Sequence, residues 1–385
     1  MREKILVKTF AGLELLLQEE LIELGGLNCT ILSRAVQCEG DIRFLYRVNY
    51  FSRLALRVLL QVKEFVFRNN KEYYDELYNV EVEKFLEPSG TLAISTTMHQ
   101  SIFKTPLYAS LLAKDAFCDR FRHRYDQRPS VDKEQPDVQF HIHIFENKAT
   151  LFLDSSGDSL HKRGYRVSTH PAALNEVVAA AIIKHTDWKA DCDVIDFMCG
   201  SATLLIEAAM IALNIPAGFY RQRYGFFSWL TFNQNEWEKV KTEADIKEDV
   251  PIDFYGYDIS GRYLGMAAKN IEKARLTDFI KLKKQNLIET HPARRPTLIV
   301  LNPPYGERLN VDDIGGLYKQ IGDTLKKNFS NCTAWIISSD TNALKQIGLH
   351  ASRKITLFNG ALECKLMKFE LYEGRKYSAP SHSER

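Results

Sequence analysis

A polar and conformationally restricted tetrapeptide, Asn302-Pro303-Pro304-Tyr305, directly follows the apolar run Thr297–Leu301. Each proline fixes its own φ and disfavours helical backbone in the residue before it, so the Asn302 side chain and the Pro303 carbonyl should point in preset directions. Two fixed oxygen acceptors can bind the two N–H groups of an exocyclic amine and raise the electron density on its nitrogen, while Tyr305 can stack on the base. The residue types favour chemistry at a nucleobase amino group; a plain proline turn that ends a strand is the alternative.

A second segment predicts a ligand-binding loop between a strand and a helix. The apolar pair Val194-Ile195 and then Asp196 lead through Phe197-Met198-Cys199-Gly200-Ser201-Ala202-Thr203 into 204–210, which has a helical apolar pattern. Gly200 lets the backbone approach a ligand closely, and the first N–H groups of the following helix lack intrahelical partners. The loop does not have the three glycines of the dinucleotide fingerprint, which disfavours a nicotinamide or flavin cofactor.

Two further runs also lead into polar side chains: the apolar run Phe254–Asp258, and Ile280–Lys284, which contains both apolar residues and lysines. Asp258 ends the first run, and an acid at the end of a second strand typically binds ribose hydroxyls. Asn286 follows the second run, and we expect residues 216–240 with a linker to form the helix between the first two strands. Singly, such residues are typical of caps and turns. Four of these features in this order, at the ends of successive strands, favour one ligand site.

These motifs resemble those of S-adenosylmethionine-dependent amino-methyltransferases, which act on adenine N6, guanine N2 or protein glutamine. The loop is similar to their Asp-Pro-x-Cys-Gly-Ser-Gly-Thr motif and departs from it at Phe197 and Ala202. The resemblance implies that the ribose is held by Asp258, that Ile259 packs on the adenine of the cofactor and that Asn286 faces the adenine amino group. The implied catalytic residues are Asn302, Pro303, Pro304 and Tyr305. The implied cofactor-binding residues are Asp196, Phe197, Met198, Cys199, Gly200, Thr203, Asp258, Ile259, Asn286 and Leu287, with Thr169 and His170 from the segment that precedes this half of the chain.

Strand and helix patterns alternate through the rest of this half, which predicts a doubly wound α/β sheet. A helix is expected at 314–329, followed by strands at 334–338, 354–358 and 365–372. The pair Asn359-Gly360 is a turn signal, and a short connection implies antiparallel neighbours. The resemblance implies a Rossmann-like sheet of seven strands whose last strand enters antiparallel.

The first part of the chain needs a separate account, because 385 residues exceed the usual size of one domain. Its opening suggests a ferredoxin-like α+β unit, with strands at 4–9, 29–33 and 35–40, helices at 13–24 and 42–49, and an apolar stretch at 55–66. Beyond it we expect helices at 73–85 and 106–122 and strands at 92–96, 139–145 and 150–154. We predict three domains, at 1–65, 66–160 and 161–385.

Basic segments at 114–124, 128–132 and 161–166 resemble the THUMP domain, an RNA-binding module, and its exit into the catalytic domain. The arrangement is similar to that of the bacterial 23S ribosomal RNA guanine-N2 methyltransferase family over essentially the whole chain. The implied RNA-binding residues, interleaved with Phe121 and Tyr125, are Arg120, Arg122, Arg124, Arg128, Lys162 and Arg163. A solvated helix end is the alternative for this cluster. The net charge is only +2, so RNA binding would depend on local patches.

Other residue types argue mainly against certain classes of protein. The seven cysteines contain no closely spaced pair of the zinc or redox type, and we expect reduced, buried thiols. His141 and His143 share one face of a predicted strand, but no third ligand is placed nearby and we expect no metal. The sequence has no signal peptide and no apolar stretch near the ~18 residues that span a bilayer, so we expect a cytoplasmic protein.

The family resemblance implies methylation of the N2 amino group of a guanine in RNA, with 23S ribosomal RNA as the expected substrate and S-adenosylmethionine as the cofactor. Adenine-N6 methylation of RNA or DNA uses the same tetrapeptide and is the first alternative. Methylation of a release-factor glutamine would leave the THUMP-like region unexplained. A non-catalytic RNA-binding assembly factor with a degenerate cofactor site is a further alternative, which the changes at Phe197 and Ala202 leave open.

Overall fold

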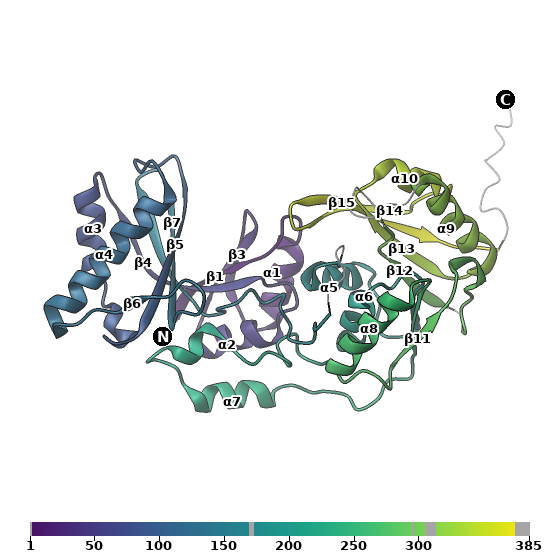
Figure 1. The fold of residues 1–385 in the computed structure, drawn as a ribbon, viewed down its shortest axis with the longest axis horizontal. Coiled ribbons are helices and arrows are strands. Elements are labelled where there is room, and N and C mark those ends of the chain that lie inside the picture. The colour runs from purple at the N-terminus through teal and green to yellow at the C-terminus, as the bar shows by residue number, and fades with distance from the viewer. Residues whose placement is uncertain (1, 169–172, 295, 305–312, 374–385) are drawn as a thin grey trace, which may run out of the picture. The chain divides into compact units, whose positions relative to one another are not determined.

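The computed structural model describes residues 2–168, 173–294, 296–304 and 313–373. The chain forms two compact units (Figure 1). Unit 1 comprises Met1–Thr9, Leu13–Lys162 and Ala217–Ala244. Unit 2 comprises Phe10–Gly12, Arg163–Pro216 and Asp245–Arg385.

Unit 1 is built on one mixed eight-stranded sheet with the order β2-β3-β1-β4-β8-β7-β5-β6. The long strand β4 pairs with β1 on one side and with β8 on the other, so the ferredoxin-like strands continue into those of the following region without a break. The predicted boundary after residue 65 therefore falls at the end of a shared strand. The strands are β1 (Glu3–Lys8), β2 (Leu27–Leu32), β3 (Ala35–Gly40), β4 (Arg57–Val66), β5 (Thr91–His99), β6 (Ser130–Val131), β7 (Val138–Phe145) and β8 (Lys148–Asp154).

The helices of unit 1 begin where the sequence supplies a capping side chain. Asp41 accepts a hydrogen bond from the N–H of Phe44, and Thr105 precedes a helix that starts with Pro106. The helix expected at 73–85 begins earlier, after the Asn69 cap, and ends earlier, at Tyr78. A separate 3₁₀ turn, η1 (Val82–Lys84), follows it. The helices are α1 (Glu14–Glu23), α2 (Ile42–Phe51), α3 (Asn70–Tyr78) and α4 (Pro106–Tyr125).

The prediction of a crossover helix at 216–240 is wrong. The helix that follows the first strand of the catalytic sheet is α6 (Thr203–Ala212), and residues 217–244 pack in unit 1. They carry η2 (Gly225–Ser228) and α7 (Gln234–Thr242). Trp237 packs edge-on against Tyr50 of α2, with ring centroids 5.4 Å apart. Burial of this aromatic surface against α2 explains why the segment folds with unit 1, although β9 and β10, the strands before and after it in the sequence, belong to unit 2.

Unit 2 contains a seven-stranded sheet with the order β11-β10-β9-β12-β13-β15-β14. Neighbouring strands are parallel except that β15 runs antiparallel to both β13 and β14, which confirms the predicted methyltransferase-type sheet. The predicted turn falls between β14 and β15, where Gly360 has a φ of 69°. The strands are β9 (Asp193–Asp196), β10 (Phe254–Asp258), β11 (Ile280–Lys284), β12 (Thr297–Leu301), β13 (Thr333–Ser338), β14 (Arg353–Asn359) and β15 (Leu362–Glu370).

Helices cover both faces of this sheet, as a doubly wound fold requires (Figure 1). One face carries α5 (Glu176–His185), α6 and α8 (Gly261–Lys273), and the other carries α9 (Ile314–Asn328) and α10 (Thr341–Gln346). The sequence analysis did not predict α8 and α10. Within the described residues, no helix is long and apolar enough to cross a membrane.

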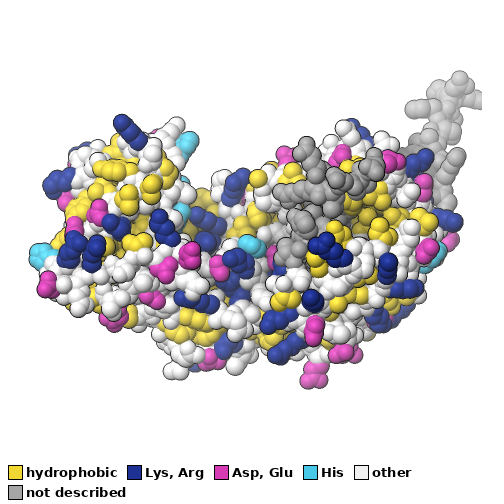
Figure 2. Space-filling model, viewed as in Figure 1, with side chains coloured by type: hydrophobic (Ala, Val, Ile, Leu, Met, Phe, Trp, Pro, Cys, Tyr) yellow, Lys and Arg dark blue, Asp and Glu magenta, His cyan; other side chains and the backbone are white. Residues whose placement is uncertain are grey.

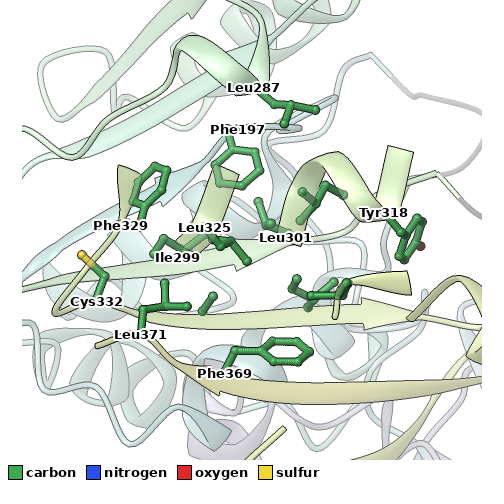
Figure 3. Packing of buried hydrophobic residues seen from close by; sticks show 14 of the residues in the cluster. Phe197, Leu287, Ile299, Leu301, Tyr318, Leu325, Phe329, Cys332, Phe369 and Leu371 are labelled. Carbon is green, nitrogen blue, oxygen red and sulfur yellow. The ribbon is translucent and has the colours of Figure 1, made fainter. Parts of the chain in front are cut away.

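The core on the α9 side explains one departure from the family loop motif. Phe197 is buried and lies against Phe329, with ring centroids 5.7 Å apart. Both rings belong to a cluster with Ile299 and Leu325 between the sheet and α9 (Figure 3). Phe197 thus fills core volume where the family has proline.

The expectation of seven reduced cysteines is wrong for one pair. Cys29 of β2 and Cys38 of β3 form a disulfide, because the hairpin between these paired strands brings their Cα atoms to 4.2 Å. The pairing depends on how the two strands fold against each other, and the spacing of the two cysteines in the sequence gives no sign of it. Cys118, Cys192, Cys199, Cys332 and Cys364 are not in disulfides.

Candidate active site

Four parallel strands bring the predicted motifs to one edge of the sheet in unit 2. In the order β11, β10, β9, β12 these strands are neighbours, so their carboxyl ends share an edge. Asp196 ends β9 and Asp258 ends β10. Asn286 follows β11, and Asn302 follows β12. The motifs therefore lie at the place where doubly wound folds bind ligands.

Asp258 is tied directly to the loop after β9. The N–H of Gly200 donates to its Oδ2 at 3.1 Å, and the N–H of Ser260 donates to its Oδ1 at 2.8 Å. These bonds fix the carboxylate, whose remaining lone pairs can accept hydrogen bonds from ribose hydroxyls. At Gly200, which has a φ of 52°, no described heavy atom lies within 4 Å of the place a Cβ would take. Open space beside this backbone suits a ligand that packs against it.

Ala202 occupies a conformation that normally favours glycine. Its φ is 64°, it immediately precedes α6, and its N–H donates to the carbonyl of Cys199 at 2.7 Å. Left-handed backbone costs an L-residue about 1–2 kcal/mol. The loop therefore keeps the geometry that the family glycine would give, at a local cost in stability.

Asp196 is buried and has an unusual charge state. The N–H of Met198 donates to its Oδ1 at 3.0 Å. Burial raises the pKa of Asp196 to about 8; the Met198 hydrogen bond opposes this shift, and the nearby charge of Asp258 adds to it. The carboxyl group is thus mostly protonated at neutral pH and can become a carboxylate when a positive charge is placed beside it.

The other predicted cofactor residues fall into two groups. Ile259 is 68% exposed, and the Asn286 side chain accepts from the N–H of Ile288 at 3.3 Å, so both belong to the surface at the strand ends. The side chains of Phe197 and Leu287 lie in the core cluster, and Met198 packs against it. The Cys199 thiol is buried, which raises its pKa far above the ordinary value. Thr169 and His170 lie outside the described residues.

Asn302 presents an acceptor that the protein itself does not use. Its Oδ1 is buried and has no hydrogen-bond partner among the described residues. Pro303 is buried, and the Tyr318 hydroxyl lies 3.4 Å from the carbonyl of Pro304 and 2.7 Å from Ser338 Oγ. Tyr318, at a core position of α9, supports the proline turn and was not predicted. Tyr305 lies outside the described residues.

A second set of unpredicted residues joins the connecting segment, residues 163–168, to the loop. Asn270 of α8 accepts hydrogen bonds from the N–H groups of Val167 and Ser168 at 2.9 and 3.0 Å. Its amide donates to the carbonyls of Ser168 and Ser201 at 3.0 and 3.2 Å. Arg166 reaches the start of α6 by donating to Thr203 Oγ1 at 3.0 Å. Asn270 lies in the middle of a helix with no recognisable motif around it, so the sequence offered no signal that it joins the connecting segment to the loop.

Arg166 is itself held by a buried ion pair with Glu176. The Nε–Oε1 distance is 2.7 Å, and the guanidinium also donates to the carbonyl of Leu174 at 2.9 Å. Nearby, Glu207 accepts from the hydroxyl of Tyr165 at 3.0 Å and pairs with Arg163 at 3.5 Å. The connecting segment is therefore fixed at several points by charge and hydrogen bonding.

These contacts correct two of the predicted RNA-binding residues. Arg163 is only 1% exposed and is held by Glu207. Arg120 is also buried and donates to both carboxylate oxygens of Glu83, at 2.8 and 2.6 Å. A guanidinium committed to a buried or largely buried carboxylate cannot contact a phosphate without leaving that carboxylate unpaired. Both arginines are structural.

The other predicted RNA-binding residues are on the surface. Arg122, Arg124 and Lys162 are exposed and form ion pairs with Asp119, Glu83 and Asp158. Arg128 is exposed and has no ion pair within the described part of the chain. Figure 2 shows basic and acidic side chains interspersed over the visible face, as the net charge of +2 suggests.

Comparison with known proteins agrees with this geometry. The profile of the RMKL-like methyltransferase domain matches residues 163–368, that of the THUMP domain matches 67–154, and that of the RlmL ferredoxin-like domain matches 4–59. The ribosomal RNA large subunit methyltransferase K/L of Methylococcus capsulatus is 36% identical over 96% of this chain. That match covers 51% of the relative, so the chain spans about half the length of the K/L proteins it resembles.

Two solved structures share the whole architecture. One, described as "a putative methyltransferase complexed with SAH", has a TM-score of 0.87 and 28% identity, and the match covers 97% of this chain and 99% of that chain. The other, described as "a predicted N6-adenine-specific DNA methylase" from Listeria monocytogenes, has a TM-score of 0.87 and 25% identity, with 96% and 97% covered.

The fold and the site at the strand ends define a methyltransferase whose cofactor is S-adenosylmethionine. The chain belongs to the RMKL-like methyltransferase family, with a ferredoxin-like domain and a THUMP domain ahead of the catalytic domain. Open space at Gly200, the fixed carboxylate of Asp258 and the exposed Ile259 fit this cofactor.

Proposed function

We propose that this protein methylates the exocyclic N2 amino group of a guanine in RNA, with large-subunit ribosomal RNA as the substrate. The observation that carries the proposal is the buried, unpartnered Oδ1 of Asn302 at the end of β12, in a chain that also contains a THUMP domain. The names of relatives that match most of the chain support ribosomal RNA as the substrate class.

The role of Asn302 follows from the hydrogen-bonding needs of the amine. The guanine is flipped out of its stack so that its amino group reaches the protein. One N–H of the amine donates to Asn302 Oδ1, and the other donates to the carbonyl of Pro303. Both bonds orient the nitrogen lone pair and raise its electron density, so positioning supplies most of the acceleration. Tyr305 stacks on the base in this proposal.

The cofactor is held by the strand ends of β9, β10 and β11. When bound, S-adenosylmethionine supplies an electrophilic methyl group. Asp258 binds its ribose, Ile259 packs on its adenine and Asn286 accepts from the adenine amino group. Thr169 and His170 complete the proposed contacts. No side chain is assigned as an obligate base, because an amine that has gained a methyl group is acidic enough to lose a proton to solvent.

We assign RNA capture to the THUMP region, residues 66–160, ahead of the catalytic part at 161–385. The proposed surface contacts are Arg122, Arg124 and Arg128 in this region, with Lys162 just after it. These side chains are exposed, and the ion pairs that Arg122, Arg124 and Lys162 form at the surface are weak enough to be exchanged for phosphate.

The decisive experiment is transfer of labelled methyl from S-adenosylmethionine to RNA purified from a strain that lacks the protein, followed by nucleoside digestion and mass analysis. Label in N2-methylguanosine from large-subunit RNA is the expected result. Unlabelled RNA together with labelled protein, or no label at all, would contradict the proposal and favour a protein substrate or a non-catalytic binding factor.

Adenine N6 is the second candidate target. It is favoured by the Listeria structure named as an N6-adenine-specific DNA methylase, and the Asn-Pro-Pro-Tyr tetrapeptide serves that amine equally well. The same experiment separates the two, because label would then appear in N6-methyladenosine or its deoxy form.

A further inference from the structure

One face of the sheet in unit 1 is polar where the opposite face is buried. Along β7, Phe140, Ile142 and Ile144 are fully buried, and Phe140 packs against Phe117 of α4. Because side chains alternate along a strand, His141 and His143 point to the opposite face. Ser95 and Thr97 of the neighbouring β5 are paired with these histidines in the strand register. We call the surface formed by Lys8, Arg57, Ser95, Thr97, His141 and His143 the polar sheet face.

Lys8 lies along this face without a carboxylate partner. Its Nζ contacts Nε2 of His141 at 3.1 Å, across the two strands β4 and β8 that separate β1 from β7. No Asp or Glu of the described chain forms an ion pair with it. Burial, and next the charge of Arg57, lower the pKa of Lys8, and the nearby charge of Asp154 only partly opposes this shift.

The strand register places a second cation beside it. Lys8 and Arg57 are directly opposite each other in the antiparallel pair of β1 and β4, an arrangement in which like charges are destabilising. Arg57 is paired with Asp154, so that carboxylate is already engaged. The two cations thus share one described acid, and a negative charge from outside the chain would stabilise the group.

The histidines do not supply or cancel charge on this face. Burial, followed by the charges of Lys8 and His143, lowers the pKa of His141 to about 3, so its ring is neutral at pH 7. Since Nε2 of His141 accepts from Lys8, its Nδ1 carries the proton and donates to Ser95 Oγ, at 3.0 Å. The Thr97 hydroxyl lies 3.1 Å from His141 Nε2 and 3.2 Å from His143 Nδ1. A neutral imidazole therefore contacts the ammonium group, and the hydroxyl groups of Ser95 and Thr97 contact that imidazole in turn.

We infer that the polar sheet face binds a phosphate of the RNA backbone, with Lys8 as its charged contact and the neighbouring hydroxyl groups as polar contacts. Lysine acts as a point charge toward phosphate, and a partly exposed, hydrogen-bonding sheet face can contact phosphates and sugars through its exposed side chains, Ser95, Thr97 and His143. The inference rests on the proposed function, which supplies RNA as the partner. It moves part of the RNA contact from the α4 arginines to the opposite face of the sheet.

The test compares Lys8→Gln with Lys63→Gln in the full chain. Lys63 is a matched control, because it is a partly buried lysine on β4 that pairs with Glu76 of α3 at 2.7 Å. RNA binding is measured by fluorescence anisotropy with a labelled large-subunit RNA fragment between 50 and 200 mM salt, without cofactor. Loss of one phosphate contact should weaken binding about five- to tenfold and reduce the salt slope by about 1. Lys8→Arg, which keeps the charge, should restore both.

Three outcomes would overturn the inference. Wild-type affinity and slope in Lys8→Gln would exclude the contact while leaving RNA as the partner. An equal loss in Lys63→Gln would show a general effect of net charge. Absence of RNA binding by the wild-type protein would remove this inference and the proposed RNA substrate together, and only that result would count against both.

Discussion

At the scale of single residues, the site is defined by polar groups that the fold leaves unsatisfied. The Oδ1 of Asn302 is buried without a described partner, and an unpaired buried acceptor costs about 1–3 kcal/mol. A fold accepts such a cost most readily where a ligand supplies the missing donor. The amine of the target base is that donor in the proposed reaction.

We expect Asn302→Ala to lower kcat at least about 100-fold while the Kd of S-adenosylmethionine changes less than about threefold. The amide polarises the amine and is not among the proposed cofactor contacts. Single-turnover methyl transfer and calorimetry measure the two quantities, with the exposed Asn342→Ala as the control. Turnover at the wild-type rate would exclude Asn302 from catalysis.

Asp196 should make cofactor binding depend on pH. Its pKa of about 8 lies above the value near 4 expected in the unfolded chain, so the protonated form is favoured in the folded state below pH 8. S-adenosylmethionine carries a sulfonium charge, which favours the carboxylate. Affinity should therefore rise as the pH increases from 6 to 8, by at most about tenfold per unit, and level off above pH 8.

Calorimetric titrations across this range check the prediction for Asp196. Asp196→Asn has no titrating group at this position and should remove the dependence between pH 6 and 8. The same raised pKa predicts that the contribution of this carboxyl group to folding stability is fully present below pH 4 and is lost as the pH rises through 8. A pH-independent Kd for the wild-type protein would contradict the assignment.

At the scale of elements, helix α8 positions the cofactor loop through one side chain. Asn270 is 1% exposed and joins the connecting segment to the carbonyl of Ser201. Asn270→Leu should leave four backbone groups without this partner and raise the Kd of S-adenosylmethionine at least about tenfold, with a smaller effect on kcat. Asn270→Asp keeps the accepting oxygen and should give an intermediate Kd.

The control for this prediction is Asn49 of α2, an equally buried asparagine in unit 1. Its amide donates to the carbonyl of Leu45 at 2.9 Å and to Ser155 Oγ at 2.8 Å. Asn49→Leu should lose comparable stability and leave the cofactor Kd within about twofold. If both variants weaken cofactor binding equally, Asn270 acts only through global stability.

At the scale of the whole molecule, residues 217–244 are inserted between strands of unit 2 but fold with unit 1. Trp237→Ala removes the aromatic core of this insertion and should destabilise unit 1 by about 3–5 kcal/mol. Differential scanning calorimetry with S-adenosylhomocysteine (SAH) shows which unfolding transition belongs to which unit, because a ligand of unit 2 raises only the melting temperature of that unit. A Trp237→Ala effect confined to the SAH-sensitive transition would contradict the division into units.

The sequence by itself determined the succession of strands along the catalytic half of the chain, the loop after β9 and the carboxylates and amides at the strand ends. Periodicity, capping and turn residues act over a few positions, so a linear pattern carries them. The family resemblance added the cofactor and the seven-stranded sheet, which the fold and the comparisons confirm.

Only the tertiary structure decided which polar residues were free to act. Arg120 and Arg163 look like surface cations in sequence, yet Arg120 pairs with the largely buried Glu83 and Arg163 pairs with the buried Glu207. The disulfide, the hydrogen bonds of Asn270 and the placement of residues 217–244 likewise depend on contacts between segments far apart in the chain or on adjacent strands. Charge, reactivity and exposure are set by such neighbours, and a one-dimensional pattern does not contain them.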